Sequence, residues 1–453
     1  MINSIQSNRR NQSITTCTDH IYYSVIVTNA DQTSTAPIPI TYNETRTEPI
    51  VTDPQEYYFS IIQFSIDTTA LPILIPTMNL STSSTAQRPT LQTPEPTIYT
   101  ITLTYTYTNP ATGQTTTYCS APTPVQWYPE AINSNIPSND LNTLTQDNYS
   151  TWYYCYSYQY WIFLINQTFI TAYNSLNTVV LDVGLTLPST NPPFMTWDAG
   201  QATATINCDI GSQTTGGYLT LYSNANTITG NSGINPFYYN QISIFFNSSL
   251  YNLFNSFPMT RMNWGTQISV SFPASISSDG TITSTSQTTV PNGNVQILVN
   301  SYNGTACSAL PTSPFNLTDT TTFCTVPQEY STTPAWNPVT AILFQSNMSI
   351  IPSNEGSPLV YDGKALLSSS NPMIVMEITD FASSNADYRG YINYTPSGEY
   401  RLIDLQGNDP IKNITFQTYF KDRLGVSRPL VLLSGGSCSI KMMFRKKTFN
   451  LGY

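Results

Sequence analysis

Charge is the scarcest feature of this sequence. Only 9% of its 453 residues are Asp, Glu, Lys or Arg, and the formal net charge is −10. An ordinary soluble protein has about 25% charged residues. A surface with so few charges generates little repulsion between copies of the chain, which suits a protein that assembles.

The sequence also lacks the residues on which most enzymes depend. It has a single histidine, His20, which argues against His-rich zinc sites and His-based acid–base chemistry. It contains no GxxxxGK, GxGxxG or GxSxG motif, so phosphate-loop, dinucleotide and nucleophile-elbow chemistry is not indicated. Asp380 and Asp387 are the nearest approach to a carboxylate pair in the C-terminal region. We therefore expect no catalytic residue, no metal site and no cofactor.

Long apolar runs and paired cysteines are missing as well. The sequence contains no run of about 18 apolar residues, so it predicts no membrane span. The first residues, MINSIQSNRRNQS, lack the apolar segment that a secretion signal has at its centre. The seven cysteines lie far apart and form no CxxC. We expect free, buried thiols, since a bridge between Cys307 and Cys324 would need oxidising conditions.

What the sequence has in abundance is β-forming and turn-forming residues. Runs such as 21–27 (IYYSVIV) and 57–66 (YYFSIIQFSI) favour strands. In residues 101–107, apolar side chains alternate with Thr, which predicts a strand with one apolar face. Strand signals at short spacing continue from residue 338 to the C-terminus, as in a sandwich or barrel. The composition therefore predicts an all-β fold.

One segment departs from this pattern. In residues 157–176, apolar side chains recur at spacings of three and four without Pro or Gly, which predicts an amphipathic helix. Its polar face carries no Lys or Arg, so we expect it to cover a sheet rather than lie on a membrane.

The few basic residues gather at the C-terminal end. Residues 389–453 contain ten of the 16 Lys and Arg and four acids, so they carry +6, whereas residues 1–388 carry 6 basic and 22 acidic side chains, or −16. Strand alternation predicts that Lys441 and Arg445 lie on one side of a strand, with Met443 between them. These cations either deter edge-to-edge strand pairing or contact nucleic acid or an acidic partner.

Several stretches resemble the penton (vertex) protein of virophages and Polinton-like double-stranded DNA viruses. They span residues 150 to 447, and the last block is the most specific. The stretches are Tyr156-Ser157-Tyr158-Gln159, Ile165-Asn166, Pro193-Phe194, Trp197-Asp198, Ile244 to Asn247, Leu250 to Phe257, Trp336-Asn337-Pro338, Tyr391 to Tyr394, Glu399 to Leu405, Ile414 to Phe420, Lys421 to Gly425, Arg428-Pro429-Leu430 and Ser437 to Lys447.

The resemblance implies a single jelly roll, five copies of which form a capsomer at each fivefold vertex of an icosahedral virion. It implies neighbouring major capsid protein capsomers as partners and no catalytic residue. We expect a jelly-roll sandwich with a large insertion or long loops and one amphipathic helix. The expected parts are an N-terminal arm (1–20), first jelly-roll strands (21–108), an insertion (109–337) and second jelly-roll strands with the basic end (338–453).

The expected functional residues are the cations at the two ends of the chain: Arg9, Arg10, Arg445, Lys446 and Lys447. They would face the particle interior and meet packaged DNA, independently of base sequence, or acidic patches of neighbouring capsid proteins. Two other functions remain open at this stage. One is a receptor- or carbohydrate-binding β-sandwich of a viral surface or fibre protein, and the other is a glycan-degrading enzyme, which would need an exposed carboxylate pair.

Overall fold

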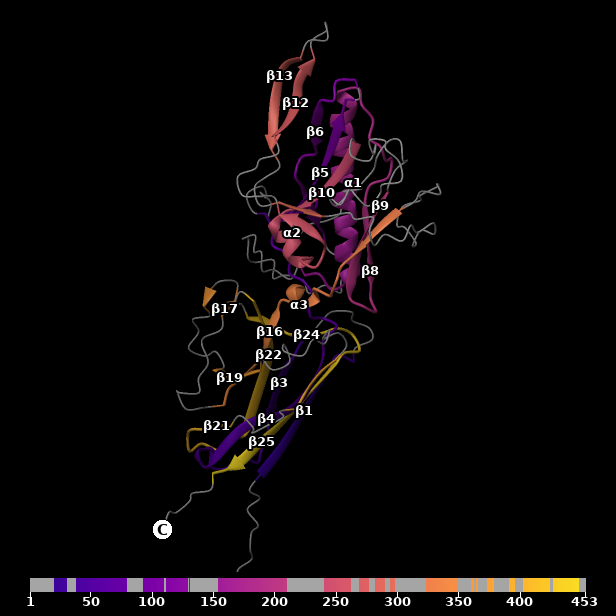
Figure 1. Cartoon of the computed structure of the whole chain (residues 1–453). Coiled ribbons are helices and arrows are strands. Elements are labelled where there is room, and N and C mark those ends of the chain that lie inside the picture. The colour runs from indigo at the N-terminus through magenta and orange to yellow at the C-terminus, as the bar shows by residue number, and fades with distance from the viewer. Residues whose placement is uncertain are drawn as a thin grey trace, which may run out of the picture. The chain divides into compact units, whose positions relative to one another are not determined.

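The computed structural model describes residues 20–30, 38–79, 93–130 except 110 and 129, 154–209, 240–261, 269–276, 282–289, 294–297, 323–348, 360–361, 364–365, 373–378, 391–395, 402–423 and 427–447. The chain divides into two compact units (Figure 1). Unit 1 combines Met1–Ala70 with Thr340–Tyr453, and unit 2 is Leu71–Val339. Unit 1 therefore draws on both ends of the chain, and unit 2 comes from the middle.

Unit 1 is built mainly from two sheets. Sheet one has the strand order β1 (His20–Thr28), β25 (Ser437–Lys446), β4 (Tyr57–Asp67) and β20 (Tyr391–Tyr394), with β21 (Ile403–Asp404) also pairing with β4. Sheet two has the order β19 (Met373–Ile378), β16 (Val339–Ser346), β22 (Asn413–Asp422) and β23 (Ser427–Pro429), with β3 (Thr41–Thr45) pairing with β22. Shorter elements complete the unit: β2 (Ile38–Pro39), β24 (Val431–Leu432), β17 (Val360–Tyr361), β18 (Lys364–Ala365) and the 3-10 helix η1 (Pro54–Glu56).

The last strand of the chain lies inside sheet one, between two strands from its beginning. β25 is antiparallel to β1 on one side and to β4 on the other, so that Ile440 is the register partner of both Val25 and Phe64. In Figure 1, yellow β25 accordingly runs beside indigo β1 and β4. Gly435 has a φ of 82° in the turn before β25, a conformation that glycine adopts without a steric penalty. The sheet thus confirms the expectation that strands from both ends of the chain share one sheet.

The core of unit 1 forms where the two sheets face each other. β25 and β22 alternate between buried and more exposed side chains along most of their length, as strands with one buried face do. Aromatic side chains meet across the interior, with ring centroids 6.1 Å apart for Phe59 and Phe416 and 5.3 Å apart for Phe64 and Phe344. Unit 1 is therefore a two-sheet sandwich.

Unit 2 contains its own sheets. The largest has the order β11 (Met259–Arg261), β14 (Val295–Ile297), β10 (Asn240–Phe246), β5 (Glu95–Thr108) and β6 (Thr115–Cys119), and β7 (Thr123–Trp127) also pairs with β5. A second sheet has the order β15 (Phe323–Pro327), β9 (Thr203–Asp209) and β8 (Phe194–Asp198). The remaining elements are the β12 (Ser269–Ile276) and β13 (Ile282–Thr289) pair and the helices α1 (Tyr158–Asp182), α2 (Ser248–Leu253) and α3 (Thr333–Trp336).

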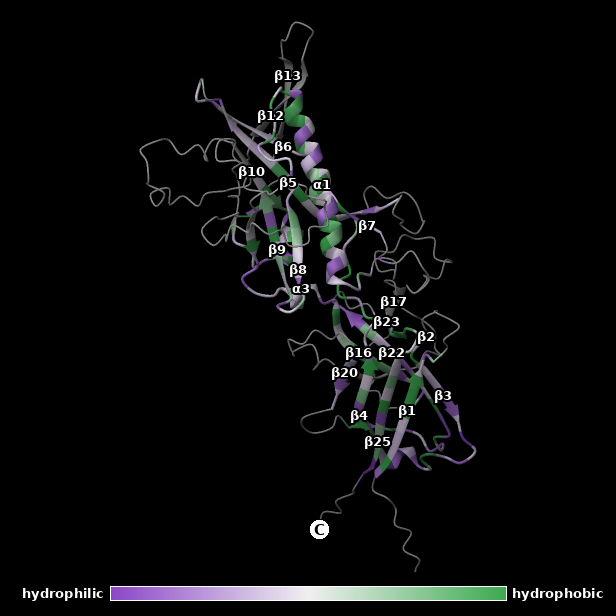
Figure 2. Ribbon diagram, turned by 90° about the vertical axis from the view of Figure 1, so that its right-hand side faces the viewer, coloured by the Kyte–Doolittle hydropathy of each residue, from purple (hydrophilic) through white to green (hydrophobic). Residues whose placement is uncertain are grey.

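Helix α1 is the helix that the sequence predicts, extended by six residues at its C-terminal end, from 176 to 182. Ser157 caps its first turn, because the side-chain oxygen accepts a hydrogen bond from the Tyr160 backbone N–H at 3.3 Å. The expected apolar face is buried against β5, β6, β7 and β8, with Trp161, Ile165, Phe169 and Ala172 each 0% exposed. Figure 2 shows hydrophobic and hydrophilic residues alternating along the helix, as a helix with one covered face requires.

The expected division of the chain differs from the structure at one boundary. The sequence-based division assigned residues up to 108 to the jelly roll, whereas unit 1 ends its first segment at Ala70. The strand β5 lies in unit 2, because it pairs with β6, β7 and β10. The proposed N-terminal arm lies outside the described residues, except for His20, which begins β1.

The cysteines whose side chains are described behave as expected. Cys119, Cys155, Cys208 and Cys438 are free and buried. Burial raises the pKa of Cys119 and of Cys438 to about 12, because a thiolate would lose its hydration. These two thiols are therefore protonated at neutral pH. Cys307 lies outside the described residues, so the structure does not test the alternative of a Cys307–Cys324 bridge.

Replacing Ile165 by Asp should destabilise the protein by about 3–5 kcal/mol, because a carboxylate would be buried without a partner. Gln167→Asp is the matched control, since Gln167 is exposed on the same helix. Thermal unfolding of the two variants measures the difference. Equal melting temperatures would show that the Ile165 face of α1 is not buried.

Candidate interaction surface

The described residues include no candidate metal site. Within them, no three His, Cys, Asp or Glu side chains gather as they would around a metal ion. Across this same part of the chain, no helix has both the length and the apolar character to cross a membrane. The features that carry chemistry are instead a basic surface at the end of β25 and a polar network at one edge of the sandwich.

The basic surface lies on the outer face of sheet one. Along β25, Lys441 and Arg445 are exposed and share one side of the strand, and Met443 lies between them. The sequence predicted this arrangement from strand alternation. Three aromatic rings from neighbouring strands surround the cations, and we call the group the basic patch: His20, Tyr22, Tyr58, Lys441, Arg445 and Lys447.

The cations and rings of the basic patch contact each other. Lys441 Nζ lies 5.6 Å from the centroid of the Tyr22 ring, and Lys447 Nζ lies 5.1 Å from that of Tyr58. The His20 ring is nearly parallel to the Tyr22 ring, with centroids 6.3 Å apart. Tyr22 is 59% exposed. Cations beside exposed aromatic faces are the arrangement that proteins use to hold flexible nucleic acid or acidic groups.

Two of the expected functional cations form ion pairs within the chain. Lys446 Nζ lies 3.2 Å from the Glu56 carboxylate. Lys447 Nζ lies 2.9 Å from the Asp404 carboxylate and donates a hydrogen bond of 2.9 Å to the Gln55 carbonyl. These contacts join the end of β25 to η1 and β21, and they neutralise part of the local positive charge.

Arg445 keeps its side chain exposed beside His20, its register partner. Of the expected site residues, Arg445, Lys446 and Lys447 therefore come together at the end of sheet one. Arg9 and Arg10 lie outside the described residues. Sequence reasoning missed His20, Tyr22 and Tyr58, although the alternation in residues 20–28 already puts His20 and Tyr22 on one face.

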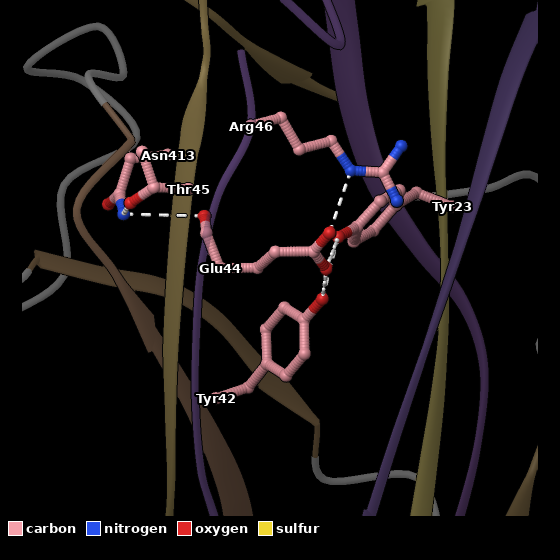
Figure 3. A network of polar contacts seen from close by, with 6 residues as sticks. All are labelled: Tyr23, Tyr42, Glu44, Thr45, Arg46 and Asn413. Carbon is pink, nitrogen blue, oxygen red and sulfur yellow. Dashed lines mark hydrogen bonds and ion pairs between the residues drawn. The ribbon is translucent and has the colours of Figure 1, made fainter. Parts of the chain in front are cut away.

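A second polar cluster joins the two sheets of unit 1 at one edge (Figure 3). The Tyr23 hydroxyl, from β1, donates a hydrogen bond of 2.5 Å to the Glu44 carboxylate of β3. Tyr42 donates to the same carboxylate. Arg46 Nε lies 2.8 Å from it, and the Arg46 guanidinium lies 5.0 Å from the Tyr23 ring centroid. One carboxylate therefore holds β1 of sheet one to β3 of sheet two.

The network shifts the pKa values of its members. The hydrogen bond from Tyr23 and the bond from Arg46 lower the pKa of Glu44 below 4.5, because both stabilise the carboxylate. Burial and the nearby Glu44 charge raise the pKa of Tyr23 to about 12. Glu44 is therefore ionised and Tyr23 protonated at neutral pH, the two states that their hydrogen bond needs.

Comparison with known proteins identifies the family. A family model described as Sputnik minor capsid protein V18/19 matches residues 21–446. The chain belongs to this family. Within the V18/19 family, the chain is 26% identical over 166 residues to the uncharacterized protein V18 of Sputnik virophage, covering 36% of this chain and 87% of V18. It is also 26% identical over 128 residues to structural protein V19 of the same virophage, covering 28% of this chain and 58% of V19.

The structure of the Sputnik virophage supports the fold. A chain in the cryo-EM structure of the Sputnik virophage superposes with a TM-score of 0.63 at 22% identity, covering 95% of this chain and 98% of that one. A crystal structure of the mavirus penton protein gives a TM-score of 0.49 at 13% identity, covering 94% and 99%. The chain is all-β and of jelly-roll type, and it is a capsid protein of the virion. The predicted relationship to virophage capsid proteins is confirmed.

Acid should weaken unit 1 through Glu44. Because the pKa of Glu44 is lowered in the folded protein, its stabilising contribution is complete above about pH 4.5 and is lost as the pH falls through the lowered pKa. Glu44→Gln should therefore lower the melting temperature at pH 7, and its difference from the wild type should shrink below pH 4.5. Glu48→Gln is the control, since Glu48 is exposed on the loop after β3. A difference that is constant with pH would contradict the role of the carboxylate.

Proposed function

We propose that this chain forms homopentameric capsomers at the fivefold vertices of an icosahedral virion. The observation that carries the proposal is the family model for a minor capsid protein, which spans both units from residue 21 to residue 446. Fivefold vertices are a small fraction of the positions in a large icosahedral shell, so a protein present in few copies suits them. The resemblance of residues 391–447 to penton proteins supports the same assignment.

The charge distribution supports assembly into a closed ring. In a ring of five copies, the same contact between neighbours occurs five times. Any charge on a contact face is therefore repeated five times around the ring. With only 9% charged residues, the chain limits this repulsion. In such a capsomer, unit 1 would form the base that meets neighbouring major capsid capsomers, and unit 2 would be the insertion that projects outward.

The basic patch would face the particle interior. Its cations, with Lys446 and with Arg9 and Arg10 on the N-terminal arm, would contact packaged DNA or acidic patches of neighbouring capsid proteins. The exposed Lys441 and Arg445 support this assignment for DNA most directly, because phosphate contacts need accessible cations rather than base-reading elements. Five copies at a vertex would act together, so that weak individual contacts sum to a useful affinity.

Native mass spectrometry of the purified chain should show a five-chain assembly. The expected mass is five times the 50.3 kDa mass of one chain. A trimer would instead favour a receptor-binding or fibre protein, and a monomer at micromolar concentration would contradict the pentamer.

Replacing Arg9, Arg10, Arg445, Lys446 and Lys447 together by Ser should reduce vertex retention and genome packaging in assembled particles. The affinity of the wild-type pentamer for a DNA duplex should fall as salt rises, through counterion release. Lys412→Ser is a control that removes an exposed cation from the turn before β22. Lys446 and Lys447 also form ion pairs with Glu56 of η1 and Asp404 of β21, so replacing them can lower stability as well as DNA binding. Arg445→Ser alone leaves these ion pairs in place and therefore tests DNA contact separately. Particles that package normally with all five replaced would refute the interior contact.

A further inference from the structure

The outer face of sheet one changes character along the strands. Beyond the basic patch, one cross-strand row consists of Ile26, Ser439, Ser65 and Asn393, one residue from each strand, and we call it the neutral row. The Ser65 hydroxyl donates a hydrogen bond of 2.6 Å to Asn393 Oδ1. Ile26 is 69% exposed at one margin of the sheet, and Tyr391, two residues from Asn393, is 53% exposed at the other.

The outer face of sheet two is neutral in a different way. Three cross-strand pairs of β22 and β3 form an amide and hydroxyl surface, which we call the amide ladder: Asn413 with Thr45, Thr415 with Asn43, and Gln417 with Thr41. Asn413 Nδ2 donates to Asn43 Oδ1 at 2.9 Å and to Thr45 Oγ1 at 2.7 Å, and Asn347 Nδ2 donates to Asn413 Oδ1 at 2.7 Å. None of these side chains carries a charge.

Both surfaces share one property with the centre of a protein interface, which is the absence of charged side chains. The buried centres of interfaces are depleted in charged residues, because a charge loses its hydration on association. The neutral row presents one large exposed apolar side chain, Ile26, on an uncharged surface. The amide ladder offers hydrogen-bond donors and acceptors, several of which are already oriented by bonds to neighbouring side chains. A preorganised polar surface loses less conformational entropy on binding.

The geometry of a ring then indicates which surfaces meet. A ring closed by rotation joins two different patches of each copy, so each copy needs two contact faces on different sides. The two outer faces of a sandwich lie on opposite sides by construction, and here each of them carries an uncharged surface. We infer that the neutral row of one copy docks against the amide ladder of the next copy in the ring.

This inference rests on the proposed pentamer and names its contact surfaces in unit 1. Its partner is a second copy of this chain, because the neutral row and the amide ladder are both uncharged and neither of these two surfaces contains the cations that a phosphate surface would require. Lys441 belongs to the basic patch and lies in the next row of the same face after Ser439. The contact would therefore end before Lys441.

A photo-crosslinker tests the docking directly. With p-benzoylphenylalanine at position 26, irradiation of the wild-type-like pentamer should link residue 26 to residues 41–45 or 413–417 of another copy, as mapped by peptide mass spectrometry. The exposure of Ile26 allows the substitution without disturbing the core. The same probe at Leu181, which is 52% exposed on α1, is the control and should not label those strands.

Charge insertion gives an independent measurement. Ile26→Lys and Asn43→Asp each introduce one charge, and Asp at position 43 keeps the oxygen that accepts from Asn413. Each variant should raise the concentration at which the pentamer dissociates at least tenfold, with an unchanged melting temperature of the monomer. A pentamer that forms normally in both variants, or a crosslink to any other surface, overturns the docking but not the pentamer. A wild-type chain that never forms pentamers overturns the proposed function itself.

Discussion

The pairing of β25 between β1 and β4 is the interaction on which unit 1 depends. It places a strand from the end of the chain in the interior of a sheet whose flanking strands come from its first 67 residues. The buried side of β25 contributes Cys438, Ile440, Met442 and Phe444 to the core, all at most 2% exposed. Removing this strand would leave β1 without its partner in sheet one, since β1 pairs there only with β25 among the described strands.

The same pairing also positions the basic side chains at the end of β25. β25 brings Lys441 and Arg445 to the outer face and carries Lys446 and Lys447 to the acids of η1 and β21. The basic residues that are consecutive in the sequence thereby take two roles. Lys446 and Lys447 link the strand end to η1 and β21, while the side chain of Arg445 remains exposed.

Local periodicity explains what could be predicted from the sequence. Helix α1 was predictable because its apolar spacing runs for five turns without Gly or Pro, and β4, β22 and β25 because β-branched and aromatic residues cluster there. Period two also predicted that Lys441 and Arg445 share a face. The sheet to which β5 belongs was not predictable, because alternation shows that a strand has two faces but not which strands pair with it.

The ion pairs of Lys446 and Lys447 could not be predicted from the sequence for a related reason. Glu56 and Asp404 lie far from residue 446 in sequence, and only the β4–β25 register brings them near. The amide ladder was hidden as well, because Asn and Thr are abundant throughout the chain and their cross-strand pairing depends on a contact between residues 41–45 and 413–417. Sequence patterns therefore gave the strands and the candidate cations, while the tertiary fold determined their neighbours.

The place of β25 also sets the timing of biogenesis. During translation, β1, β3 and β4 are synthesised before β25, so sheet one cannot close until residue 446 has been translated. All of unit 2 lies upstream of residue 340 and is synthesised before then. Non-local pairing of this kind is slow, and the strands synthesised first remain unpaired until their partner strand has been made. Ser439 belongs to the neutral row, so the proposed docking face would be complete only after β25 has been translated. The topology of sheet one would in this way exclude incomplete products from the proposed pentamer.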